Sequence, residues 1–156
     1  MSELLIIGIG QEYRSDDRVG RWVARSLQKR TWPGVEVLES TGDGTELMRL
    51  WEGHRRVWLV DAVTSQATPG SLHRISVHRQ ALPNHLFKGS THHWGVAEAV
   101  EMSRLMGTLP EEVELYGIES RVFEYGIEMS EPVTRAGHQL IQTLCSRVEK
   151  ELSCTK

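Results

Sequence analysis

Short apolar runs alternate with amphipathic stretches along most of the chain. The runs at 4–7 and 57–60 each consist only of large hydrophobic residues, which is typical of central strands buried on both faces. The stretches between the runs carry apolar side chains at helical spacing. The pattern therefore predicts strands at 4–7, 35–38, 57–60 and 112–118, and helices at 16–30, 44–52, 93–107 and from 131 onward.

One segment breaks this alternation. Residues 71–78 follow the third predicted strand after a turn at 68–70, with no helix between them. A parallel return would need a longer crossover, so we expect an antiparallel strand at the edge of the sheet. The predicted fold class is α/β, a three-layer αβα arrangement with a mainly parallel twisted sheet of about five strands and one antiparallel edge strand.

Two helices carry specific burial predictions. In the last helix, Cys145 and Cys154 are spaced so that they lie on nearly opposite faces. We therefore expect neither a disulfide nor a metal pair, but an inert buried Cys145 and a Cys154 in the tail. The helix at 93–107 is expected to turn five residues toward the sheet: Val96, Ala99, Val100, Met102 and Met106.

Length and charge narrow the class of protein. A chain of 156 residues is expected to form one domain, 1–156, in which 153–156 is a loose tail. The net charge is −3 and no long basic run occurs, so we expect neither a nucleic-acid partner nor a membrane partner. The apolar run at 4–7 is too short for a signal peptide, which predicts a cytoplasmic protein. The sequence does not reveal the oligomeric state, and a monomer is favoured.

Candidate chemistry gathers where the predicted strands end. In open α/β sheets, ligands bind outside the carboxyl ends of the strands. Asp61 ends the third apolar run, the adjacent acids Asp16 and Asp17 follow the first strand, and His92-His93 precedes a helix. Two carboxylates and an imidazole from separate strand ends suit a divalent ion such as zinc or nickel, with positions left open for a substrate.

Simpler interpretations stand beside this one. Asp61 also fits a turn residue that reaches solvent, one of the two adjacent acids fits a helix cap, and a histidine fits a surface loop. Gly8-Ile9-Gly10 begins like a dinucleotide-binding fingerprint, which leaves a nucleotide-binding domain as an alternative. Tyr13 stands where the third glycine of that fingerprint belongs.

Four motifs in order along the chain resemble those of the hydrogenase maturation protease family. Gly8-Ile9-Gly10-Gln11 with Asp16-Asp17 and Gly20 is similar to the first, and Val60-Asp61-Ala62 to the second. Ser90-Thr91-His92-His93-Trp94-Gly95 is similar to the third, and Tyr116-Gly117-Ile118-Glu119 resembles the strand before the last helix. Gln11 stands where the family usually has Asn, and the loop at 39–45 also departs from the family pattern.

The resemblance implies a nickel-dependent, aspartic-type endopeptidase. Such an enzyme removes the C-terminal extension of a nickel–iron hydrogenase large-subunit precursor after nickel has been inserted. The implied metal contacts are Asp17, Asp61 and His92, the histidine being chosen because a glycine follows it three residues later. The nickel arrives with the precursor, and other divalent ions such as zinc or cadmium can fill such a site in a crystal.

Two questions stay open at the level of sequence. Asp16 and Glu119 are candidate proton carriers beside the three implied catalytic residues, since a free carboxylate can accept a proton from an attacking water. The alternative to the enzyme is a non-catalytic, nickel-sensing assembly chaperone for the same precursor.

Overall fold

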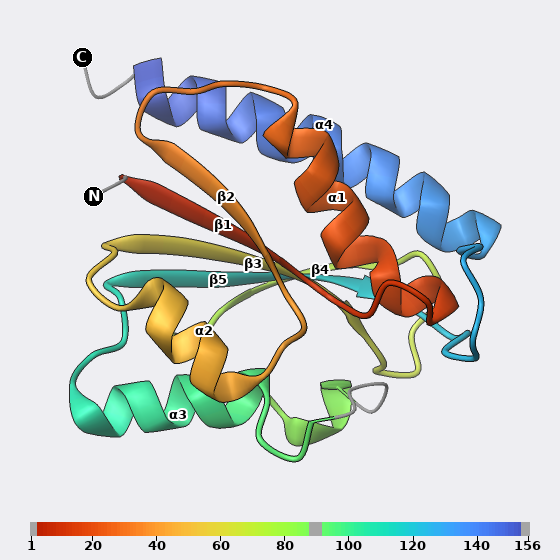
Figure 1. Ribbon diagram of the computed structural model, residues 1–156, viewed down its shortest axis with the longest axis horizontal. Coiled ribbons are helices and arrows are strands. Elements are labelled where there is room, and N and C mark those ends of the chain that lie inside the picture. Colours follow the sequence, from red (N-terminus) through yellow and green to blue (C-terminus); the bar gives the residue numbers. More distant parts are fainter. Residues whose placement is uncertain (1–2, 88–91, 154–156) are drawn as a thin grey trace.

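The computed structural model describes residues 3–87 and 92–153, and five strands in these ranges form a mixed sheet (Figure 1). The sheet has the order β2-β1-β3-β5-β4. Strands β1, β2, β3 and β5 are parallel, and β4 runs antiparallel to β5 at the edge. The predicted fold class is therefore confirmed, including the antiparallel edge strand. The strands are β1 Leu4–Ile9, β2 Val35–Ser40, β3 Arg56–Val63, β4 Leu72–Ser76 and β5 Glu112–Glu119.

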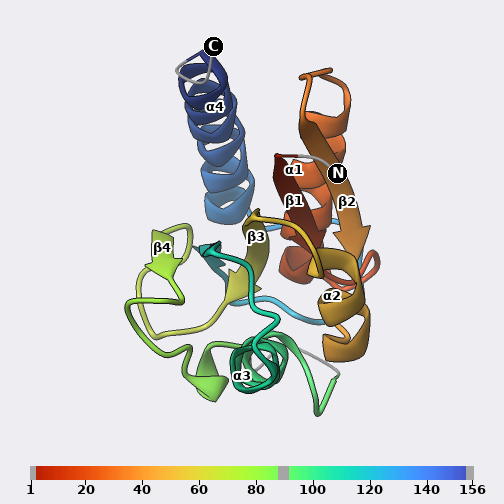
Figure 2. The same cartoon turned by 90° about the vertical axis from the view of Figure 1, so that its left-hand side faces the viewer.

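Helices cover both faces of the sheet. Helices α1 and α4 lie on one face, and α2 and α3 lie on the other, as the two views at right angles show (Figures 1 and 2). None of the helices in the described ranges is both long enough and apolar enough to cross a membrane. The helices are α1 Val19–Gln28, α2 Gly44–Trp51, α3 Val96–Met106 and α4 Glu131–Ser153, with short 3-10 turns at η1 Ser15–Arg18 and η2 Asn84–Phe87.

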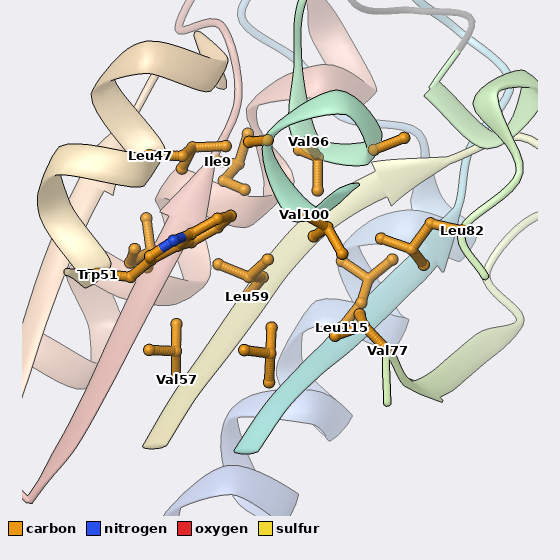
Figure 3. Packing of buried hydrophobic residues seen from close by; sticks show 14 of the residues in the cluster. Ile9, Leu47, Trp51, Val57, Leu59, Val77, Leu82, Val96, Val100 and Leu115 are labelled. Atoms are coloured by element: carbon orange, nitrogen blue, oxygen red, sulfur yellow. The ribbon is translucent and has the colours of Figure 1, made fainter. Parts of the chain in front are cut away.

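Alternation along β3 divides the core into two layers. Val57 and Leu59 pack with α2 and α3, while Trp58 and Val60 pack with α1 and α4. This follows from the two-residue period of a strand, which sends successive side chains to opposite faces. Figure 3 shows the first layer, where Trp51 of α2 lies against residues of the sheet and α3.

Close approach of α1 to the sheet depends on glycine. A Cβ atom at Gly20 would lie 2.2 Å from the carbonyl oxygen of Ile9 and 2.3 Å from that of Val60. A Cβ atom at Gly8 would lie 2.2 Å from the carbonyl oxygen of Gly20. Any side chain at these positions would force the helix away from β1 and β3. These glycines therefore hold the start of α1 against the carboxyl ends of the two central strands.

One part of the burial prediction is wrong. Met102 and Met106 of α3 are 39% and 61% exposed, and Ser103 is fully buried in the place expected for a methionine. The helical period explains the error for Met102, because positions 96, 99, 100 and 103 share one face and position 102 lies well outside it. Met106 lies at the border of this face and is the last residue of the helix. The Ser103 hydroxyl oxygen accepts a hydrogen bond of 3.1 Å from Trp51 Nε1. The buried indole N–H group of Trp51 is therefore hydrogen-bonded, as buried polar groups normally are.

The prediction for the last helix is confirmed where the structure describes it. Cys145 is buried in the layer under α4, and burial raises the pKa of its thiol. A buried thiol with a raised pKa is a poor nucleophile. Cys154, and most of the expected tail at 153–156, lie outside the described residues.

Candidate active site

A small cavity opens where β1, β2 and β3 end. Its volume is about 20 Å³, enough for one water-sized group. Asp17 and Asp61 are the acids in its lining, and the other lining residues are Ile9, Gly10, Gln11, Thr41, Gly42, Ala62, Phe87 and Val96. The carboxyl edge of the sheet thus holds a confined, acidic site, as the sequence predicts from the position of these strands.

Asp61 lies inside β3 rather than beyond its end. The strand continues to Val63, so Asp61 pairs in register with Gly117 of β5. Its side chain is only 6% exposed, and Oδ1 accepts a hydrogen bond of 2.8 Å from the backbone N–H of Ala62. Burying a carboxylate among apolar residues is unfavourable unless the charge is compensated. The strand therefore holds the carboxyl group of Asp61 where its ionised form is energetically unfavourable.

Asp17 reaches the same cavity from η1. Its residue is 6% exposed, and the turn that carries it lies against Gly10, where a Cβ atom would be 2.0 Å from the carbonyl oxygen of Asp17. Burial raises the pKa of Asp17 to about 6, although the charges of Arg14 and His92 and a hydrogen bond from the backbone of Gln11 act in the opposite direction. Asp17 is thus a carboxyl group whose ionised form is disfavoured by its surroundings.

The two carboxyl groups influence each other. Burial raises the pKa of Asp61 well above its ordinary value, and the neighbouring charge of Asp17 raises it further, against the effect of the Ala62 N–H. Two like charges in a buried site favour sharing one proton. A cation would relieve the same repulsion, so the pair fits either a proton or a divalent ion.

His92 lies near Gly42, which lines this cavity, although Ser90 and Thr91 of the same motif lie outside the described residues. Its charge acts on the pKa of Asp17, and its Cδ2 atom lies 4.0 Å from the position of a Cβ atom built on Gly42. The carbonyl oxygen of Trp94 accepts a hydrogen bond of 2.9 Å from the N–H of Gly44, which joins the histidine segment to the loop after β2.

Asp17, Asp61 and His92 are residue types that bind divalent metal ions, but they do not form a complete metal site. Two carboxylates and one imidazole are ligands that nickel and zinc accept. In the described ranges, however, no three His, Cys, Asp or Glu side chains are arranged closely enough to hold a metal ion by themselves.

Asp16 has a different environment from its neighbour Asp17. It is fully buried, and its carboxylate accepts hydrogen bonds from the N–H groups of Arg121, Val122 and Ser130 at 3.3, 3.1 and 2.7 Å. The Ser130 hydroxyl donates a fourth hydrogen bond of 3.0 Å. The structure does not bring Asp16 into the cavity, and these bonds fix η1 to the segment before α4.

Glu119 is also engaged outside the cavity. Its carboxylate accepts hydrogen bonds from the N–H and hydroxyl of Ser65, at 2.8 and 2.6 Å, and lies 3.0 Å from Nε2 of His73. Burial acts to raise the pKa of Glu119, but the bonds from Ser65 and His73 outweigh it and leave the pKa below its ordinary value. A carboxylate with a lowered pKa is a weak proton acceptor, so this geometry does not support the role of proton carrier.

The loop after β2 supplies two lining residues of the cavity, Thr41 and Gly42. Gly42 adopts a positive φ of 95°, and its N–H donates to the Ser40 hydroxyl at 3.0 Å. Gln11, in place of the usual Asn, donates from Nε2 to the carbonyl oxygen of Thr41 at 3.4 Å. The position of this loop after the second predicted strand marks it in the sequence, whereas no sequence pattern marks Phe87.

The same elements argue against the nucleotide-binding alternative. Glu39, an acid near the end of β2, forms ion pairs with Arg21 at 2.9 Å and with Arg25 at 3.0 Å. The cavity that Gly10 lines has space for one water-sized group, far below the size of a nucleotide pocket. In this chain, Gly8 and Gly20 allow α1 to pack closely against the sheet.

The fold and the site together define an α/β protein with a buried pair of acids at the carboxyl edge of its sheet. The family model of HycI, described as hydrogenase maturation protease, matches residues 22–147. The chain belongs to this hydrogenase maturation protease family, and the expected enzyme class, an endopeptidase of the hydrogenase maturation type, is confirmed. The matched range contains Asp61 and His92 and begins after Asp17.

Solved structures share the fold at low sequence identity. An endopeptidase from Escherichia coli is 22% identical with a TM-score of 0.81, over 97% of this chain and 94% of that one. The hydrogenase maturating endopeptidase HybD from E. coli is 19% identical with a TM-score of 0.77, over the same shares. HybD from Thermococcus kodakarensis is 24% identical with a TM-score of 0.64, over 95% and 99%. No curated protein matches the chain.

Proposed function

We propose that this chain is a nickel-dependent endopeptidase that removes the C-terminal extension of a nickel–iron hydrogenase large-subunit precursor. The observation that carries the proposal is the buried pair of Asp17 and Asp61, whose pKa values are both raised by burial. Such a pair is unfavourable as two free carboxylates and becomes favourable when a cation lies between them. Membership of the protease family supports the reaction class.

In this proposal the metal is part of the substrate. Asp17, Asp61 and His92 would add their oxygen and nitrogen ligands to a nickel ion that the precursor already holds. A precursor without nickel would leave the two acids uncompensated and would bind poorly. The protein would then prefer the nickel-loaded precursor, because the charge of nickel compensates the two acids.

The chain's own groups position the scissile bond and move protons. Nickel held by the precursor can polarise the carbonyl of the scissile bond or lower the pKa of a water molecule. The attacking water would lose its proton to a carboxylate oxygen of the Asp17–Asp61 pair that nickel leaves free, and that oxygen would return the proton to the leaving nitrogen. We assign this role to the pair rather than to Asp16, whose oxygens accept four hydrogen bonds, or to Glu119, whose pKa is lowered.

Mass spectrometry of a purified large-subunit precursor, with and without nickel, tests the proposal. We expect the intact protein alone to shorten the nickel-loaded precursor at one bond, and to leave the nickel-free precursor whole. Asp61→Ala should abolish cleavage. Glu111→Ala, which removes an exposed partner of Arg55 at the opposite end of the sheet, serves as the matched control and should cleave normally.

The same experiment separates the enzyme from the alternative. A nickel-sensing assembly chaperone would bind the loaded precursor without shortening it, and cleavage would appear only after another protease is added. Normal cleavage by Asp61→Ala would show that the assigned site is wrong, even if the protein is a protease.

A further inference from the structure

A second, larger cavity lies at the same edge of the sheet. Its volume is about 280 Å³, which suits one or two side chains better than a cofactor. Thr64, just beyond the end of β3, and Arg121, just beyond the end of β5, are among its lining residues. Arg14, Pro69 and Phe123 line it as well.

The two cavities are neighbours. Ala62 lines the first and Thr64 lines the second, and two residues of chain span at most about 7 Å. Arg14 lines the second cavity, and its charge acts on the pKa of Asp17 in the first. An extended peptide advances about 3.3 Å per residue. A peptide bond placed at the acid pair would therefore leave a residue about two to four positions away within reach of the second cavity.

The second cavity contains polar groups that its own walls do not satisfy. Thr64 Oγ1 is buried and makes no hydrogen bond with the described residues, although buried hydroxyl groups are normally hydrogen-bonded. The side chain of Arg121 is exposed and forms no hydrogen bond or ion pair within the described part of the chain. Both groups are available to a ligand.

The charges favour an anionic ligand. Arg14 is positioned by a hydrogen bond of 3.2 Å from its Nε to the carbonyl oxygen of Phe123, and Arg121 adds a second guanidinium. Glu119 also lines the cavity, but Ser65 and His73 already bind its carboxylate. Guanidinium groups bind carboxylates through paired hydrogen bonds.

We propose that the second cavity is a substrate subsite for a residue of the precursor that carries a carboxylate side chain, about two to four positions from the cleaved bond. The inference rests on the proposed function, because that function places the scissile bond at the acid pair. In this subsite Arg121 binds the carboxylate, Thr64 Oγ1 hydrogen-bonds the bound segment, and Phe123 and Pro69 cover its apolar part.

The test combines cleavage with binding of the nickel-loaded precursor. Mass spectrometry first locates the cleaved bond, and an Asp or Glu must lie within about four residues of it. Arg121→Ala should raise KM by about 10- to 100-fold, the effect of losing a charge-assisted hydrogen bond, with little change in kcat. Thr64→Val should raise KM by roughly 3- to 10-fold, and Arg135→Ala on α4, whose partner is Glu131, should leave KM unchanged.

Charge reversal gives an independent readout. Replacing the acidic residue of the precursor by Lys should weaken cleavage by the natural protein, and Arg121→Glu should recover it. The same variants, made in the inactive Asp61→Ala background and titrated with labelled precursor, give Kd values without cleavage.

The subsite is refuted if no acidic residue lies near the cleaved bond. It is also refuted if Arg121→Ala and Thr64→Val bind and cleave the precursor like the natural protein. In that case loss of cleavage in Asp61→Ala would leave the proposed function standing. Absence of cleavage by the natural protein would instead refute the function, while the Kd comparison would still decide on the subsite.

Discussion

Asparagine in place of Asp17 should stabilise the protein near pH 8, whereas asparagine in place of Asp16 should destabilise it. The two acids are adjacent and both are buried, so the same change in charge and nearly the same change in shape are compared. Their environments differ in one respect: four hydrogen-bond donors surround Asp16, while Asp17 lies beside a second acid.

The size of the Asp17 effect follows from its pKa. Burial raises that pKa from 3.8 to about 6, and one pKa unit corresponds to about 1.4 kcal/mol. Because the folded-state pKa lies above the unfolded one, the favourable contribution is complete below 3.8 and is lost as the pH rises through about 6. Asp17→Asn should therefore raise the free energy of unfolding by about 1–3 kcal/mol near pH 8, and by almost nothing near pH 4.

Asp16→Asn should have the opposite sign. An amide offers only one acceptor oxygen, so its NH₂ group faces at least one of the donors from Arg121, Val122 and Ser130. A buried donor left without an acceptor costs about 1–3 kcal/mol, and more where the lost partner was charged. We expect a loss of about 2–5 kcal/mol near pH 8.

Urea unfolding followed by tryptophan fluorescence measures both changes. The titrations are run with a chelator present, since a bound metal ion would stabilise the natural protein and mask the effect of Asp17. If Asp17→Asn is no more stable than the natural protein near pH 8, burial does not disfavour the ionised form of Asp17. The expected contrast between the two acids is equally refuted if the difference is the same near pH 4, or if Asp16→Asn is as stable as the natural protein.

Three further changes test the packing around the site by the same urea titration. Gly20→Ala should lose about 3 kcal/mol or more, because the new Cβ atom would meet carbonyl oxygens of β1 and β3 at 2.2 and 2.3 Å. Ser103→Ala should lose about 1–3 kcal/mol, because it leaves the buried Trp51 N–H without an acceptor. Glu119→Gln should destabilise the protein near pH 7, and the loss should shrink as the pH falls below 4.5, since stability from a lowered pKa is lost as the pH falls through it.

Each of these has a contrary outcome. A Gly20→Ala protein of normal stability would mean that α1 moves away from the sheet at little cost. An unchanged Ser103→Ala would mean that the indole finds another acceptor. An effect of Glu119→Gln that does not vary with pH would mean that the contacts of Ser65 depend on shape rather than on charge.

The amino-acid sequence determined the sheet and the neighbourhood of the site. Apolar runs such as 4–7 and 57–60 make central strands wherever they occur, because burial is their largest favourable contribution. Their order along the chain then limits the topology, and the carboxyl edge follows from the direction of the strands. Asp61 was identifiable because a carboxylate inside such a run is costly on any fold that buries it.

Only the tertiary structure decided what each acid near that edge does. Nothing local distinguishes Asp16 from Asp17, because the donors that surround Asp16 come from Arg121 to Ser130, far along the chain. The partners of Glu119 are likewise distant in the sequence, because its carboxylate contacts Ser65 and His73. Hydrogen bonds between distant segments and the depth of burial set the pKa of a carboxyl group, and both exist only after the chain has folded.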